Sequence, residues 1–117
     1  MLDRKKTTPV AQISKDNDVV TLVNVFTLSN SADQDKLVRL LDEANEKVMS
    51  HLDGFVSASI HRSLDGTRVV NYAQWRSKEA FEAMLQNQEA RKHMSKAYEL
   101  SKSEPHLYKV ESIHTLA

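Results

Sequence analysis

The order of strand and helix patterns in this chain predicts an α+β protein with a ferredoxin-like β-α-β-β-α-β arrangement. Four apolar runs rich in β-branched and aromatic residues have the composition of strands. Apolar residues at three- and four-residue spacing indicate helices after the first and third of these runs. Asp65-Gly66, between the second and third runs, is a strong hairpin signal. We therefore expect an antiparallel sheet with helices on one side. The predicted strands are residues 19–28, 55–64, 69–76 and 107–116.

The composition excludes several classes of protein. With 117 residues, the chain suits one domain with one core. Sixteen Lys and Arg balance sixteen Asp and Glu, and no basic cluster carries interleaved aromatics, so we expect no nucleic-acid partner. The absence of cysteine excludes disulfides and thiolate nucleophiles. No apolar run approaches the ~20 residues of a membrane-spanning helix, so we expect a cytoplasmic protein without a membrane partner.

The chain is expected to divide into an arm and a domain. Residues 1–18 are polar and contain Pro9, which predicts a flexible N-terminal arm outside the core. Residues 19–117 are expected to form the ferredoxin-like domain. In its first strand both faces are largely apolar, and Asn24 is the polar exception on the face it shares with Leu22 and Phe26.

Helix boundaries are predicted from capping patterns. Ser31 followed by Gln34 fits a capping box, and the first helix is expected to end near His51 or Leu52. Ser77 is expected to cap a second helix, which a break near Asn87 separates from a further helix over residues 89–100. Residues 101–105 are predicted to form a loop before the last strand.

One face of the sheet has no predicted cover. Its apolar residues would lie near water in a monomer, and an exposed patch of this kind marks an interface. A symmetric homodimer packed through this face is the economical arrangement. The residues expected on it are Val19, Val23, Val25, Phe55, Val70 and Tyr72.

The third strand predicts a binding surface. Asn71, Ala73 and Trp75 share one face, because side chains alternate along a strand. The small Ala73 between an amide and an indole leaves room for a flat ligand. The alternative is that Asn71 and Trp75 are ordinary core residues whose polar groups are satisfied.

Metal and cofactor motifs are absent from the sequence. The five histidines show no pairing at helical ligand spacing, and the chain has no glycine-rich phosphate loop or nucleophile elbow. We therefore expect neither a metal nor another cofactor. His93 on the late helix is open to two interpretations: a core or surface histidine, or a general base.

Three segments resemble the antibiotic biosynthesis monooxygenase family, and in particular its cofactor-free anthrone oxygenases. The most specific features are Asn71 and Trp75 in an Asn-x-x-x-Trp pattern, together with Asn24 on the first strand. The resemblance covers about residues 19–116. The segments are VTLVNVFTL at Val20–Leu28, VVNYAQW at Val69–Trp75 and SKSEPHLYKVESIH at Ser101–His114.

The resemblance implies a dimeric α/β barrel and a cofactor-independent monooxygenase. Its expected partners are a small aromatic substrate and O₂, with an anthrone or quinol oxidised to a quinone. Asn24, Asn71 and Trp75 are the implied catalytic residues. Haem-degrading relatives add a ligating histidine where this chain has Leu85, so haem is not expected. The residues expected to bind substrate are Leu22, Phe26, Ala73, Phe81 and His93.

Two rival functions remain open at this point. One is a small-quinol monooxygenase of general metabolism, which a polar, narrow cavity would favour. The other is a non-catalytic dimeric module that binds aromatic ligands, which a closed pocket without access to Asn71 would favour.

Overall fold

A computed structural model describes residues 8–16 and 18–117. The predicted order of elements is present, with the second helical segment divided in two. Short 3-10 turns at Ser31–Asp33 and Met49–His51 flank the first helix. The elements are β1 (Val20–Leu28), α1 (Gln34–Lys47), β2 (Phe55–Arg62), β3 (Arg68–Trp75), α2 (Lys78–Leu85), α3 (Gln88–Leu100) and β4 (Ser101–Tyr108).

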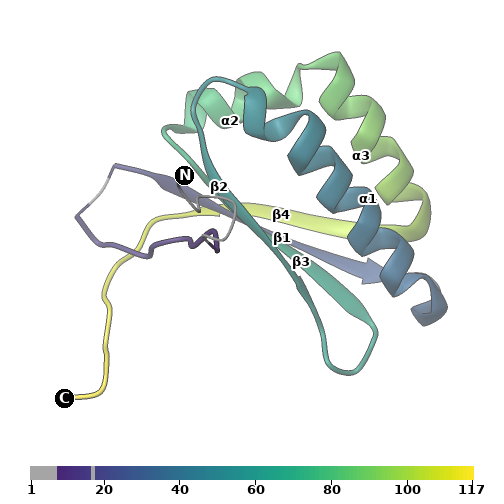
Figure 1. The fold of residues 1–117 in the computed structure, drawn as a ribbon, viewed down its shortest axis with the longest axis horizontal. Coiled ribbons are helices and arrows are strands. Elements are labelled where there is room, and N and C mark those ends of the chain that lie inside the picture. The colour runs from purple at the N-terminus through teal and green to yellow at the C-terminus, as the bar shows by residue number, and fades with distance from the viewer. Residues whose placement is uncertain (1–7, 17) are drawn as a thin grey trace, which may run out of the picture.

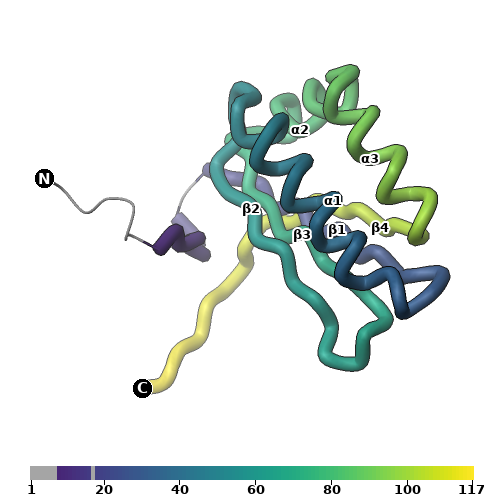
Figure 2. Tube along the Cα trace, turned by 45° about the vertical axis from the view of Figure 1, so that its right-hand side comes forward, coloured from purple at the N-terminus to yellow at the C-terminus, as the bar shows by residue number. Residues whose placement is uncertain are grey.

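The four strands form one antiparallel sheet in the order β2-β3-β1-β4. The helices α1, α2 and α3 cover the same face of this sheet, while the described residues before β1 and the chain after β4 lie toward the other face (Figures 1 and 2). The predicted ferredoxin-like α+β fold is confirmed. The central pair, β1 and β3, places the two predicted asparagine positions on neighbouring strands.

Apolar side chains fill the space between sheet and helices in two clusters. One cluster surrounds Trp75, with Leu22, Met49 and Met84 among its members. The other contains Phe26 and lies toward the start of α1. Full burial of a large apolar side chain contributes roughly 1.5–3 kcal/mol, so these clusters hold the helices on the sheet. The second cluster consists of Phe26, Leu37, Leu41, Val69 and Ala97.

The start of the first helical segment differs from the predicted capping box. Asn30 is the cap, and its side chain accepts a hydrogen bond from the Ala32 amide at 3.0 Å. Gln34 does not reach back to the cap, because its amide donates instead to the carbonyls of Ser63 and Arg68 in the β2–β3 hairpin, each at 3.0 Å. The glutamine therefore ties α1 to the hairpin.

The hairpin and the later helix starts follow the prediction. Gly66 has φ +80°, in the left-handed region that glycine adopts readily. Hydrogen bonds from Thr67 and Ser63 hold the pKa of the Asp65 carboxyl at about 2, below its usual value. Ser77 caps α2 and Asn87 caps α3 through their side-chain oxygens.

The predicted position of the last strand was wrong, because the strand lies earlier in the chain. β4 begins at Ser101, directly after α3, and residues 109–117 continue without strand pairing. The predicted loop over 101–105 is therefore part of the strand. Pro105 is tolerated because β4 is an edge strand, where a missing N–H donor can face away from the sheet. Pairing with β1 decided the boundary, whereas the prediction rested on local β-propensity.

Phe55 lies on the helix-covered face, contrary to the prediction. The β2–β3 register shifts between Phe55 and Ser57, and this irregularity turns Phe55 toward the side of Trp75. A bulge of this kind breaks the simple alternation of faces. Val23, Val25, Val70 and Tyr72 do lie on the face without helices, where each is half-buried.

The predicted arm, residues 1–18, lies partly outside the described residues. Within the part that is described, the Gln12 carbonyl accepts a hydrogen bond of 2.7 Å from the side chain of Gln74 on β3. This contact holds the segment against the helix-free face. None of the helices in the described residues is long and apolar enough to cross a membrane.

Candidate active site

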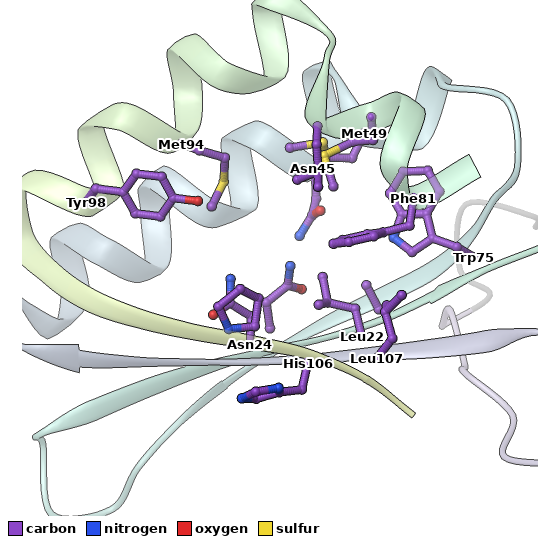
Figure 3. A pocket seen from close by; sticks show the side chains of 15 residues that line it. Leu22, Asn24, Asn45, Met49, Trp75, Phe81, Met94, Tyr98, His106 and Leu107 are labelled. Carbon is purple, nitrogen blue, oxygen red and sulfur yellow. The ribbon is translucent and has the colours of Figure 1, made fainter. Parts of the chain in front are cut away.

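A cavity of about 170 Å³ lies between the sheet and the helices (Figure 3). β1 and β3 supply its floor, α1, α2 and α3 supply its roof, and β4 closes one side. Its lining is mostly apolar. The lining residues are Leu22, Asn24, Asn45, Met49, Asn71, Ala73, Trp75, Phe81, Met84, Leu85, Met94, Tyr98, Pro105, His106 and Leu107.

Two asparagines form the polar part of the floor. Asn24 and Asn71 are direct partners in the β1–β3 ladder, so their side chains stand next to each other on the same face. The Asn24 side chain rises from the sheet, and Asn45 reaches down toward it from α1 (Figure 3). The Oδ1 atoms of Asn24 and Asn71 are buried and have no hydrogen-bond partner among the described residues.

Trp75 forms the end wall. Its side chain is 1% exposed and packs edge-on against Phe55 and Phe81, with ring centroids 5.5 and 6.5 Å away. The indole Nε1–H is buried and finds no acceptor in the described part of the chain. A buried tryptophan N–H ordinarily has a partner, so this donor is unusual.

These unpaired groups mark a candidate ligand site. Leaving a buried polar group unsatisfied costs roughly 1–3 kcal/mol, and three such atoms belong to residues that line one apolar cavity. A flat molecule with oxygen substituents could supply the missing partners. Of the described residues that line the cavity, none is Asp, Glu, Lys or Arg. The unpaired amide oxygens can therefore accept hydrogen bonds from ligand hydroxyl groups, and the indole N–H can donate one to a ligand oxygen.

Three of the five residues expected to bind substrate line the cavity: Leu22, Ala73 and Phe81. The other two do not. Phe26 is fully buried in the second apolar cluster, because β1 carries it past the cavity toward the start of α1. His93 lies between α3 and α1, where its Nδ1 is 3.9 Å from a carboxylate oxygen of Glu43.

The titratable groups of the lining are few. His106 belongs to β4, and its imidazole points away from the cavity, toward the opposite face of the sheet (Figure 3). Tyr98 extends from α3 with its hydroxyl directed inward (Figure 3). No group of three or more His, Asp or Glu residues suited to hold a metal ion occurs in residues 8–16 and 18–117.

Comparison with known proteins identifies the family. The model of the antibiotic biosynthesis monooxygenase family matches residues 19–96, which is more than half of the chain. The chain belongs to the antibiotic biosynthesis monooxygenase family. It is also 41% identical over 96 residues to the tetracenomycin-F1 monooxygenase of Streptomyces glaucescens, an alignment that covers 82% of this chain and 85% of that protein.

Solved structures of antibiotic biosynthesis monooxygenases share the fold. The monooxygenase from the gene ActVA-Orf6 of Streptomyces coelicolor, in complex with nanaomycin D, matches with a TM-score of 0.74 and 26% identity, over 84% of this chain and 92% of that one. SnoaB, a cofactor-independent oxygenase from Streptomyces nogalater, matches with a TM-score of 0.67 and 27% identity, over 82% and 96% of the two chains. These similarities identify the chain as a cofactor-free monooxygenase, as the sequence predicts, with a role in antibiotic biosynthesis.

Apart from Phe81, the sequence did not predict the residues that form the roof of this monooxygenase cavity. Asn45, Met49, Met94 and Tyr98 all line it from helices. Helical spacing marks apolar stripes but does not say which member of a stripe borders an empty space. One indication for Asn45 was present in the sequence: it follows the apolar position Ala44 and does not lie on the charged side of α1.

Proposed function

We propose that this monooxygenase oxidises an anthrone or a quinol-type aromatic with O₂ to a quinone. The observation that carries the proposal is the set of unpaired buried atoms of Asn24, Asn71 and Trp75 around one apolar cavity. An electron-rich phenolic ring fits the apolar walls, its hydroxyl groups can donate to the amide oxygens of Asn24 and Asn71, and a ring oxygen can accept from the Trp75 N–H. Two similar proteins support the assignment by their names: one is called tetracenomycin-F1 monooxygenase, and another was crystallised with nanaomycin D.

The proposed reaction requires a carbanion or enolate of the substrate. The substrate CH₂ carbon loses a proton, and the resulting anion passes one electron to O₂. Recombination forms a carbon–oxygen bond and gives a peroxide. The peroxide then loses water, so that CH₂ and O₂ become C=O and H₂O.

The contribution of the protein is to favour the anion. The amide N–H groups of Asn24 and Asn71 are the donors we assign to the developing oxyanion, and such a donor is worth roughly 3–4 kcal/mol where one has been removed. The apolar walls exclude water, which strengthens these hydrogen bonds. The Trp75 N–H would orient the substrate or the oxygen molecule.

We also propose that the enzyme acts as a homodimer. The helix-free face of the sheet carries the half-buried Val23, Val25, Val70 and Tyr72 in adjacent positions. Pairing this face with the same face of a second copy would bury it. The contact between Gln12 and Gln74 places the described part of the arm beside this face.

Oxygen uptake with dithranol, a model anthrone, tests the function. Protein freed of metal with EDTA should consume one O₂ for each quinone formed, faster than a protein-free blank. Isotopically labelled O₂ should leave one labelled atom in the quinone and one in water. Activity that disappears with EDTA and returns with iron or copper would contradict the cofactor-free reaction.

A single-ring hydroquinone in the same assay distinguishes an anthrone oxygenase from a small-quinol monooxygenase. A large preference for the hydroquinone over dithranol would support the small-quinol monooxygenase. Tight binding of dithranol without any oxygen uptake would support a binding module.

A further inference from the structure

A second hollow adjoins the cavity on the helical side. It has a volume of about 320 Å³ and lies between α2 and α3. It shares Met84, Leu85, Met94 and Tyr98 with the inner cavity, so these side chains separate the two spaces. Leu85 and Tyr98 are 44% and 50% exposed, so the outer hollow opens to solvent beside them. Ala90, Arg91 and Ser95 complete its lining.

The inner cavity is small for a fused ring system. At about 170 Å³ it resembles a cavity of ~150 Å³ that holds one benzene molecule. A substrate of three fused rings must therefore extend beyond it. The side chains of Met84 and Met94 stand between the two hollows, and methionine adapts its shape readily. The outer hollow is the space into which the remaining rings can extend.

Arg91 gives the outer hollow a chemical preference. Of the described residues that line the cavity or the outer hollow, Arg91 is the one with a charged side chain. Its side chain is exposed and forms no ion pair with another described residue. Its backbone is fixed in the first turns of α3, where its N–H donates to the Asn87 carbonyl at 3.0 Å. A guanidinium at such a position can bind a carboxylate through two parallel hydrogen bonds.

We propose that the outer hollow is a second binding subsite, in which Arg91 binds a carboxylate at the far end of the aromatic substrate. The inference deepens the proposed function, on which it rests, because it assumes that the reacting ring occupies the inner cavity. It narrows the substrate class to fused aromatics that carry an acidic group remote from the carbon that is oxidised.

Binding of quinones tests the subsite without any turnover. Danthron and rhein have the same three rings and hydroxyl groups, but rhein also carries a ring carboxylate. Titration calorimetry should show that the unaltered protein binds rhein more tightly than danthron. Arg91→Gln should weaken rhein binding about tenfold, because a charge-assisted hydrogen bond is lost, and should change danthron binding less than twofold. The affinity of Arg91→Lys for rhein should lie between the affinities of the unaltered protein and of Arg91→Gln.

Lys92→Gln is the matched control. Lys92 is the next residue on α3, is exposed and lines neither hollow. The substitution removes the same charge and should change the binding of either quinone less than twofold. Equal effects of Arg91→Gln and Lys92→Gln on rhein would overturn the subsite, as would unchanged rhein binding in Arg91→Gln or no binding of either quinone to the unaltered protein.

The outcome is separable from that of the proposed function. If the protein oxidises dithranol but Arg91→Gln leaves rhein binding unchanged, the subsite proposal alone is refuted. If the quinones bind as expected but no anthrone is oxidised, the proposed reaction alone is refuted.

Discussion

At the scale of single residues, the site is marked by polar atoms that the folded chain leaves unpaired. The carbonyl oxygens of Asn24 and Asn71 and the indole N–H of Trp75 are buried beside a cavity lined mostly by apolar side chains. The hydroxyl of Thr21 is also buried and unpaired among the described residues, but its strand position puts it on the opposite face of the sheet. Unpaired groups cost stability, and the three at the cavity are the ones to which a ligand has access.

Asn71→Ala should lower kcat by roughly 10²–10³ on an anthrone and change KM little, because it removes a donor to the developing oxyanion. Thermal stability should change little, because the side chain that is lost has an unpaired buried oxygen. Steady-state kinetics and thermal midpoints of the same preparations measure both effects. Thr21→Val, which removes an unpaired hydroxyl on the other face, is the control and should keep full activity. Full turnover by a folded Asn71→Ala variant would show that Asn71 is a core residue.

Trp75→Phe should reduce the rate less than Asn71→Ala does. The substitution removes the Nε1–H but retains an aromatic ring between Phe55 and Phe81. Thermal midpoints are needed, because the smaller ring also loses packing in a buried position. If the rate falls only in proportion to the folded fraction, the indole N–H has no role in turnover.

At the scale of elements, the loop before β2 positions the end of β3. The Gly54 carbonyl accepts a hydrogen bond of 2.7 Å from the Arg76 amide, directly after Trp75. Gly54 has φ +85°, and a Cβ atom placed there would clash with the Cβ of Ala80 on α2. The absence of a side chain at Gly54 therefore allows the loop, the end of β3 and the start of α2 to meet beside the cavity.

Gly54→Ala should destabilise the fold by more than Gly66→Ala. Both positions have positive φ, which costs a non-glycine residue about 1–3 kcal/mol. At Gly66 no described residue other than its chain neighbours lies within 4 Å of the added methyl group, so backbone strain acts alone there. Urea denaturation of both variants measures the difference, which reports the contact with Ala80. Equal losses of stability would mean that α2 moves away without cost.

At the scale of the whole molecule, the helices all lie on one side of the sheet. The other face carries the β-branched and aromatic side chains of Val23, Val25, Val70 and Tyr72. The described part of the N-terminal arm lies at one end of this face (Figures 1 and 2). Val23 and Tyr72 are direct partners near the middle of this face. A homodimer would bury them without changing the cavity, which lies on the opposite side.

The protein should sediment at twice its chain mass at micromolar concentration. Val23→Lys should shift it toward the monomer, because burial of an unpaired charge in an apolar interface is unfavourable. Leu64→Lys is the control: Leu64 is fully exposed at the hairpin tip, and its replacement should leave the dimer intact. A stable monomer of the unaltered protein in analytical ultracentrifugation would refute the dimer.

The sequence by itself determined the order of the elements in this protein and, along β3, the residues that share a strand face. Alternation along β3 puts Asn71 and Trp75 on one side, the capping residue Ser77 begins α2 where predicted, and Gly66 reverses the chain where predicted. These features depend on neighbours a few residues away, so local patterns suffice. The family resemblance added Asn24.

The tertiary structure alone decided which distant residues meet. It set Asn24 opposite Asn71, brought Asn45 and Tyr98 over them, kept Phe26 out of the cavity, and began β4 at Ser101. Each outcome depends on the register of hydrogen bonds between strands and on the packing of helices over the sheet. Those interactions join segments far apart in the chain, and local propensity does not encode them.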